Sequence, residues 1–265
     1  MDAKMQSVKE YWDSRAELGP EAGTQDLIAR QLEVRAIEEY VKDGMTILDA
    51  GCGNGMTALE LAERHKVNII GMDFAPKMIG DARELANKRK LKGPIHFGVW
   101  DITDCFLNYQ SMFDLVYTQR AIINLPDWET QKKTIELLGT YLKPGGKYLM
   151  CECSQDGLDE INQLRKQIEL DEIKSPWHNR YLRDKEVMSL AYEAADAFGS
   201  QKNVGLQRVH DFSSTYYYLS RIINAWLAAQ EGKEPDYNSP INQLSLQLPS
   251  FGNCGQVKLW VWQKI

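Results

Sequence analysis

The sequence lacks the features of membrane proteins and of disulfide-stabilised proteins. No apolar run approaches the roughly 20 residues that a transmembrane helix needs, and the first ten residues are polar. The cysteines are few and odd in number, which disfavours a disulfide framework; they are Cys52, Cys105, Cys151, Cys153 and Cys254. A cytoplasmic protein is therefore expected.

The sequence also lacks an excess of basic residues and any familiar metal-binding spacing. The formal net charge is −6 and the pI is near 5.4, which disfavours nonspecific attraction to nucleic acid or to an anionic membrane. No CxxC or HxxxH pattern is present, and Cys151 and Cys153 are interpreted as structural residues of a strand. We therefore predict no metal, no nucleic acid and no membrane as partners, and a monomer or a homodimer.

Short apolar runs alternate with longer amphipathic runs from residue 46 onward. This pattern predicts an α/β fold: a Rossmann-like open sheet of about seven mostly parallel strands with helices on both faces. Right-handed crossovers would bring the carboxyl ends of these strands to one edge, where a ligand is expected. Strands are predicted at 46–50, 67–73, 95–101, 113–119, 147–153 and 256–263, with another ending near 210, and helices at 56–65, 76–90, 128–142 and 216–229.

Two segments fall outside this repeating pattern. Residues 1–41 have the amphipathic spacing of helices, and residues 154–205 form a polar, helix-prone stretch without predicted strands. We expect a single domain over 1–265, with 1–41 as an N-terminal helical lid and 154–205 as a helical cap insertion on the acceptor side.

The stretch ILDAGCGNGMT (47–57) is the first functional signal. It places Gly51, Gly53 and Gly55 at alternate positions after a buried strand, and glycine accepts positive φ and carries no Cβ. A dinucleotide fingerprint would need glycine where Met56 stands, and the lysine and hydroxyl of a P-loop are missing. Together with Asp49, the loop suits a ligand that has a cationic aminoacyl end and no pyrophosphate.

Carboxylates at the ends of the next two strands extend this signal. Asp73, in GMDFAP, is placed to accept both hydroxyls of a ribose, with Phe74 or Met78 packing on a purine. Asp101, in VWDITD, is placed to receive an adenine amino group. Acidic residues at three successive strand ends beside a glycine loop predict a nucleoside site.

These motifs together resemble the class I S-adenosylmethionine-dependent methyltransferase family of the small-molecule type. LDAGCGNG is similar to the family's first motif, WDITD to its adenine motif, FDLVYTQRAIINL to its fourth-strand motif and LKPGGKYLM to its turn into the fifth strand. The resemblance covers about 41–153 strongly and the last third only by topology. It implies S-adenosyl-L-methionine as the cofactor, with S-adenosyl-L-homocysteine as the product.

The resemblance also implies roles for individual positions around the cofactor. The backbone at Gly51, Cys52 and Gly53 would hold the methionine portion and Asp73 the ribose. Further contacts are implied for Asp49, Phe74, Met78, Asp101, Ile102 and Gln119, and closure from the N-terminus for Tyr11, Trp12 and Arg15. Arg15 would pair with the cofactor's carboxylate, whereas Tyr11 and Trp12 would equally well staple the first helix to the core.

Candidates for the acceptor side lie in QRAIINL (119–125), SPWHNRYLRD (175–184) and RVHDFSSTYYYLSR (208–221), which ends at Arg221. Arg120 is a candidate for acceptor contact and catalysis or for a structural salt bridge. His178 is a candidate for a base or for a residue that caps or packs inside the insertion. Glu152 is a candidate for a base or for a helix-cap partner. Acceptor contacts are expected from Arg120, Asn124, Trp177, Arg180, Tyr181 and Tyr216, because arginine, histidine and tyrosine clusters favour phosphate, carboxylate or sugar hydroxyls.

The sequence therefore predicts a methyltransferase that acts on an oxygen or nitrogen of a small polar molecule. Sugars, nucleotide sugars, phosphate-bearing compounds and secondary metabolites are the expected acceptors. The alternatives are methylation of RNA or protein, a non-catalytic cofactor-binding subunit of the same fold, and a nicotinamide-dependent oxidoreductase. Glycine spacing disfavours the last of these, and acidic charge disfavours RNA.

Overall fold

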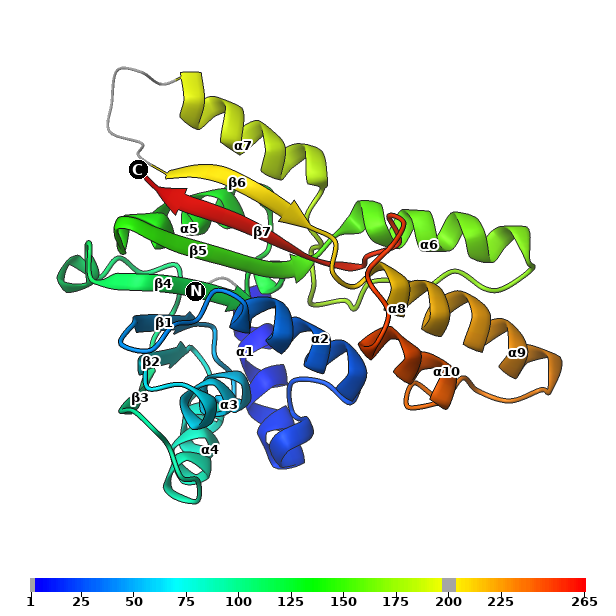
Figure 1. Cartoon of the computed structure of the whole chain (residues 1–265), viewed down its shortest axis with the longest axis horizontal. Coiled ribbons are helices and arrows are strands. Elements are labelled where there is room, and N and C mark those ends of the chain that lie inside the picture. Colours follow the sequence, from blue (N-terminus) through cyan, green and yellow to red (C-terminus); the bar gives the residue numbers. More distant parts are fainter. Residues whose placement is uncertain (1–2, 197–203) are drawn as a thin grey trace.

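The computed structural model describes residues 3–196 and 204–265, and these residues build one open seven-stranded sheet. The strand order is β3-β2-β1-β4-β5-β7-β6 (Figure 1). The strands are β1 (Thr46–Ala50), β2 (Asn68–Asp73), β3 (Ile95–Val99), β4 (Phe113–Gln119), β5 (Leu142–Cys153), β6 (Val204–His210) and β7 (Val257–Lys264).

Strand pairing in the sheet is parallel except at β7. That strand lies between β5 and β6 and runs antiparallel to both. The prediction of about seven mostly parallel strands is thereby confirmed. β5 begins earlier than the predicted residue 147, because Leu142 already pairs with Phe113 across an irregularity in the β4–β5 register.

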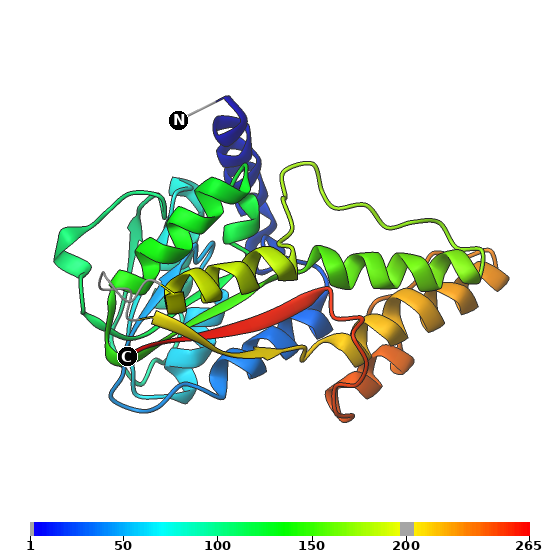
Figure 2. The ribbon, with the colours of Figure 1, turned by 90° about the horizontal axis from the view of Figure 1, so that it is seen from above.

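Helices cover both faces of the sheet. α5 (Trp128–Thr140) and α7 (Asp184–Asp196) lie on one face, and α2 (Leu27–Glu38) and α3 (Met56–Arg64) lie on the other (Figure 2). Local signals set where the helices begin: Asp26 and Asp127 cap α2 and α5 by accepting backbone N–H groups. Pro76 opens α4 (Pro76–Asn87), where its missing N–H is not needed.

Apart from the sheet and the helices that cover it, the described chain forms an N-terminal arm and a projecting lobe. The arm consists of α1 (Ala3–Arg15), the 3-10 segment η1 (Ala16–Glu21) and α2. In the lobe, α6 (Gln155–Gln167) lies beside a rod made of α8 (Ser214–Tyr218), the π-helical turn η4 (Leu219–Asn224) and α9 (Ala225–Gln230), as both ribbon views show. The short α10 (Pro240–Gln243) packs against η4.

The predicted insertion divides into parts with different positions. α6 belongs to the projecting lobe and α7 packs near β6, whereas residues 176–181 return to the carboxyl edge of the sheet. Residues 197–203 of the insertion lie outside the described residues. Across the described ranges, no helix combines the length and the apolar character needed to cross a bilayer.

Candidate functional site

The glycine loop after β1 opens a cavity at the carboxyl edge of the sheet. Gly51, Gly53 and Gly55 all adopt positive φ, at 81°, 54° and 73°. A Cβ on Gly51 would lie 2.4 Å from the Cβ of Ala121, whereas a Cβ on Gly53 would meet no protein atom within 4 Å. Gly53 therefore faces open space, which is the first chamber: a cavity with an empty volume of about 1030 Å³ including its open mouth.

Asp73 closes β2 and supports this loop from the neighbouring strand. Its Oδ2 accepts a hydrogen bond from the backbone N–H of Gly53 (2.8 Å), and its Oδ1 accepts one from Ala75 (2.9 Å). Burial raises the pKa of Asp73 to about 6, although both backbone donors act in the opposite direction. Each carboxylate oxygen keeps a second lone pair, so the group can still accept two ligand hydroxyls.

Asp49 lies at the floor of the first chamber, on β1. The hydroxyl of Tyr117 donates to its Oδ2 at 2.6 Å. Burial raises the pKa of Asp49 to about 7, the Tyr117 hydrogen bond lowers it, and the nearby Asp73 raises it further. A cation entering the chamber would favour the ionised form of both acids.

The predicted adenine-side residues line the same chamber. Phe74, Met78, Asp101 and Ile102 all border it, with Met78 and Ile102 largely buried. Asp101 Oδ1 accepts hydrogen bonds from the backbone N–H and the hydroxyl of Thr103 (2.9 and 2.7 Å). Among the residues that the structure describes, no donor is recorded for its Oδ2, which leaves this oxygen as an acceptor for an amino group.

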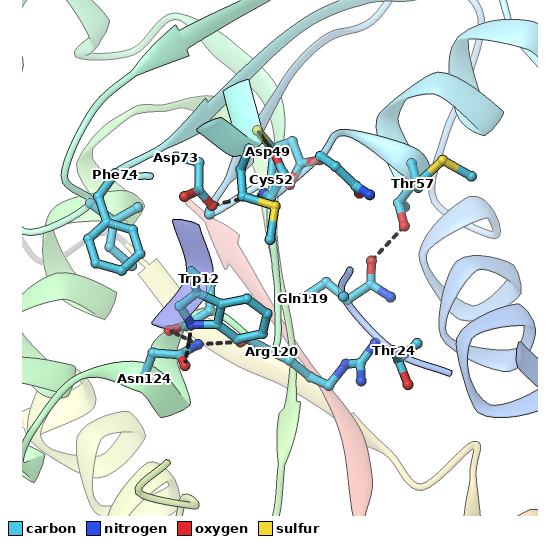
Figure 3. Close-up of a pocket in the computed structure, with 18 of the residues that line it drawn as sticks. Trp12, Thr24, Asp49, Cys52, Thr57, Asp73, Phe74, Gln119, Arg120 and Asn124 are labelled. Atoms are coloured by element: carbon cyan, nitrogen blue, oxygen red, sulfur yellow. Dashed lines mark hydrogen bonds between the residues drawn. The ribbon is translucent and has the colours of Figure 1, made fainter. Parts of the chain in front are cut away.

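A row of buried side-chain hydrogen bonds holds Gln119 at the end of β4, and no sequence motif predicted it. Thr57 donates to Gln119 Oε1 (2.7 Å), and Gln119 Nε2 donates to Glu33 Oε2 (2.5 Å). Figure 3 shows the Thr57–Gln119 bond within the first chamber. Glu33 is 1% exposed, and burial raises its pKa against the attraction of the Arg120 guanidinium. Only helical packing of α2 brings Glu33 here, and no local motif marks it.

Arg120 follows β4 in a strained turn. Its φ is +52°, a conformation that residues other than glycine rarely adopt. Glu152 supports the turn by accepting backbone N–H groups of Ala121, Ile122 and Ile123 (3.1, 3.1 and 3.4 Å). Of the two interpretations of Glu152, the structure therefore shows the cap partner. The Arg120 side chain lies 3.3 Å from Glu33.

Arg120 also borders a second cavity, the second chamber, whose empty volume is about 970 Å³ including its open mouth. The two chambers share Trp12, Gly23, Thr24 and Arg120 as walls. Figure 3 shows Arg120 extending toward Thr24 and the Trp12 ring lying beside Asn124. Trp12 Nε1 donates to Asn124 Oδ1 at 3.1 Å, which ties the N-terminal arm to the turn after β4.

Residues predicted to form the lid and the base meet in the second chamber. Tyr11, Arg15 and His178 border it and do not border the first chamber. His178 stacks on Tyr11 with ring centroids 4.3 Å apart, and burial and the Arg15 charge lower its pKa. Arg15 donates to the carbonyl oxygens of Ala22 and Glu21. A neutral imidazole at this place can accept a proton.

The remaining predicted acceptor residues divide between the chambers and other positions. Tyr181 borders the second chamber and Asn124 the first. Trp177 is 60% exposed, Arg180 pairs with Glu186, and Tyr216 is fully buried with its hydroxyl on Asp26. These last three border neither chamber. Arg221, the last residue of the 208–221 stretch, also borders the second chamber, although nothing in the sequence gives it an individual role.

Comparisons with known proteins identify the domain. A family model described as a methyltransferase domain matches residues 41–202. The chain is 31% identical over 148 residues to sterol 24-C-methyltransferase erg6 of Aspergillus fumigatus, covering 54% of this chain and 38% of the relative. It is 27% identical over 205 residues to phosphoethanolamine N-methyltransferase 1 of Arabidopsis thaliana, covering 72% of this chain and 40% of the relative. The matches thus span about two fifths of the length of these relatives.

A comparison of structures agrees on the fold. The methyltransferase in a Haloferax volcanii complex with the Trm112 methyltransferase activator superposes with a TM-score of 0.63 at 16% identity, covering 97% of each chain. The fold is that of S-adenosylmethionine-dependent methyltransferases, as the resemblance of the motifs implied.

Proposed function

The chain belongs to the methyltransferase-domain family, and from that premise we propose that it transfers a methyl group from S-adenosylmethionine to an oxygen or nitrogen of a small polar molecule. The observation that carries this proposal is the pair of adjoining chambers with common walls. One chamber has the donors and acceptors that a sulfonium nucleoside needs, and the other offers room for an acceptor beside it.

The residues present in the first chamber fit the cofactor. Open space at Gly53 gives the methionine portion close access to the backbone, and Asp49 and Asp73 offer carboxylates to a cation and to ribose hydroxyls. The free oxygen of Asp101, with Ile102 and Phe74, suits the adenine. When bound, S-adenosylmethionine supplies an already activated methyl group, so the protein has little bond-making chemistry to promote.

The contribution of the chain is then alignment and exclusion of water. Holding two reactants in line is worth roughly 7–11 kcal/mol of the barrier. The Trp12–Asn124 hydrogen bond and the Tyr11–His178 stack hold the N-terminal arm over the shared wall of the chambers. We propose that residues 1–41 act as a lid and that, within 154–205, the segment 176–181 acts as the cap.

A proton acceptor is needed only for a hydroxyl or a protonated amine. His178 is our candidate base, because it borders the second chamber, its lowered pKa keeps it neutral, and its buried Nδ1 has no partner within the described residues. Arg120, at the wall common to both chambers, is our candidate for orienting the acceptor.

Several observations favour a small acceptor over RNA or protein. The chain carries a net charge of −6, and relatives are named for sterol and phosphoethanolamine methylation. We propose a sugar, nucleotide sugar, phosphate-bearing compound or secondary metabolite as the acceptor, and a monomer or homodimer in the cytoplasm. Light scattering of the purified chain tests the oligomeric state.

Calorimetric titration tests the cofactor assignment. S-adenosylmethionine and S-adenosylhomocysteine should bind and NAD should not. Asp73→Ala should abolish binding while the protein stays folded, whereas Asp171→Ala, at an exposed position away from both chambers, should bind as the parent does. Binding of NAD alone, or unchanged affinity in Asp73→Ala, would reject the proposal. A screen for S-adenosylhomocysteine release across acceptor classes then identifies the substrate.

A further inference from the structure

Positive charge exceeds negative charge around the second chamber. The cations on its walls are Arg15, Arg120 and Arg221, and the acid on its walls is Asp26. Arg15 is bonded to carbonyl oxygens and so keeps its full charge unpaired by any carboxylate in the described chain. Glu33, behind Arg120, is an acid whose pKa burial has raised. A chamber of this kind attracts anions.

Arg221 is held rigidly without using all of its donors. Its Nη2 donates to Asp26 Oδ2 at 2.8 Å, and its guanidinium lies over the rings of Tyr237 and Tyr217, 4.0 and 5.2 Å from their centroids. Ring contacts fix the plane of the group but consume no N–H. Its Nη1 is buried and has no partner among the described residues. The side chain as a whole is 13% exposed and borders the second chamber, which leaves part of it accessible to an occupant.

The backbone around Arg221 is also unusual. Residues 219–224 form a π-helical turn, a rare feature that occurs frequently at functional sites. Arg165, from the neighbouring α6, donates to the carbonyl of Arg221 at 2.5 Å and so stabilises the turn. Of the residues in this turn, Arg221 is the one that borders the second chamber.

The helix α2 positions both Arg120 and Arg221. Asp26 caps α2 and pairs with Arg221, and Glu33, seven residues later on the same face of α2, pairs with Arg120. Seven residues of α-helix rise about 10 Å. Arg120 lies at the wall common to both chambers, whereas Arg221 borders only the second.

We propose that the methyl acceptor carries a carboxylate or phosphate group that Arg221 binds, with the atom to be methylated lying toward Arg120. This inference rests on the proposed function, since it names the acceptor class for the same site. It adds Arg221 as a specificity-determining residue, and it makes α2 the element that sets the distance between the anionic end and the methylated end of the acceptor.

The test uses three ring compounds that differ in one substituent. Phenyl phosphate, benzoate and phenol are titrated calorimetrically into the full chain saturated with S-adenosylhomocysteine. At least one of the two anions should bind ~10-fold or more tightly than phenol, and the comparison of the two tells phosphate from carboxylate. Equal affinity for all three compounds would overturn the proposal.

Substitutions locate the anion. In the double variant Asp26→Asn/Arg221→Met the ion pair is removed as a unit, and asparagine still caps α2, so no buried charge is left unpaired. Anion affinity should fall at least ~10-fold. The matched control is Glu38→Gln/Arg64→Met, which removes another arginine paired with an acid of α2, at 2.8 Å, away from both chambers.

The outcomes separate the two proposals. Unchanged anion affinity in the Asp26/Arg221 variant, or an equal fall in the Glu38/Arg64 control, would overturn the role of Arg221. S-adenosylhomocysteine should bind equally to the parent and to both variants. If it does not bind the parent chain, the proposed function itself fails, and that result is read before any anion is added.

Discussion

Replacing Gly53 with alanine adds one methyl group to the wall of the first chamber. Gly53 has φ +54°, and a left-handed conformation costs a residue with a Cβ about 1–2 kcal/mol. The new Cβ meets no protein atom within 4 Å, so no clash is added. The melting temperature should therefore fall by only roughly 2–8 °C, given about 2–4 °C per kcal/mol for a chain of this size.

Cofactor affinity should respond much more strongly than stability. The methyl group would project into space that we assign to the methionine portion, and one extra methyl in a packed site costs about 1–3 kcal/mol. The dissociation constant for S-adenosylhomocysteine, measured by calorimetry, should rise roughly 5- to 150-fold. The added group leaves the Gly53 N–H available to Asp73, so the effect is steric.

Gly44→Ala is the matched control. Gly44 also has positive φ, at 88°, also has open space around its Cβ position, and also donates its N–H, to Lys66. It lies in the turn before β1, away from both chambers. The two variants should lose similar stability, and only Gly53→Ala should lose affinity. Equal affinity in both would show that no ligand occupies the space beside Gly53.

Two further predictions concern the buried acids. Burial raises the pKa of Asp49 to about 7 and that of Asp73 to about 6, so protons compete with a cationic ligand below these values. The affinity for S-adenosylmethionine should therefore rise from pH 5.5 to 8 and then level off. Titrations at several pH values that show constant affinity would contradict this prediction. Glu152→Gln should lower the free energy of unfolding by about 1–3 kcal/mol and reduce turnover, because an amide cannot accept hydrogen bonds from all three backbone N–H groups of the Arg120 turn. Chemical denaturation measures the first effect and S-adenosylhomocysteine release measures the second. A Glu152→Gln variant as stable as the parent would show that Glu152 does not support this turn.

The fold and the floor of the first chamber were predictable from short stretches of sequence. Around ILDAGCGNGMT, a buried strand, a loop of glycines and an amphipathic helix follow one another within 19 residues, 46–64, so local pattern alone indicates the strand–loop–helix unit. Parallel strands place their carboxyl ends at one edge, and so Asp49, Asp73 and Asp101 had to approach the same cavity.

Only some of the residues that line the second chamber could be predicted from the sequence. Arg120, His178 and Tyr181 border it, whereas Trp177, Arg180 and Tyr216, which were grouped with them by proximity along the chain, border neither chamber. Within a loop or helix, neighbours in sequence face different directions, and no periodicity distinguishes the one that faces a cavity.

The sheet, the glycine loop and the acids at the strand ends could thus be predicted from the amino-acid sequence, because each depends on residues close together in the chain or on the fixed geometry of parallel strands. Tertiary structure alone decided that Glu33 joins Gln119 and Arg120, and that Asp26 holds Arg221 across 195 residues of chain. Those contacts depend on how α2 and the π-helical turn pack over the sheet edge, and the packing of distant segments leaves no local pattern in the amino-acid sequence.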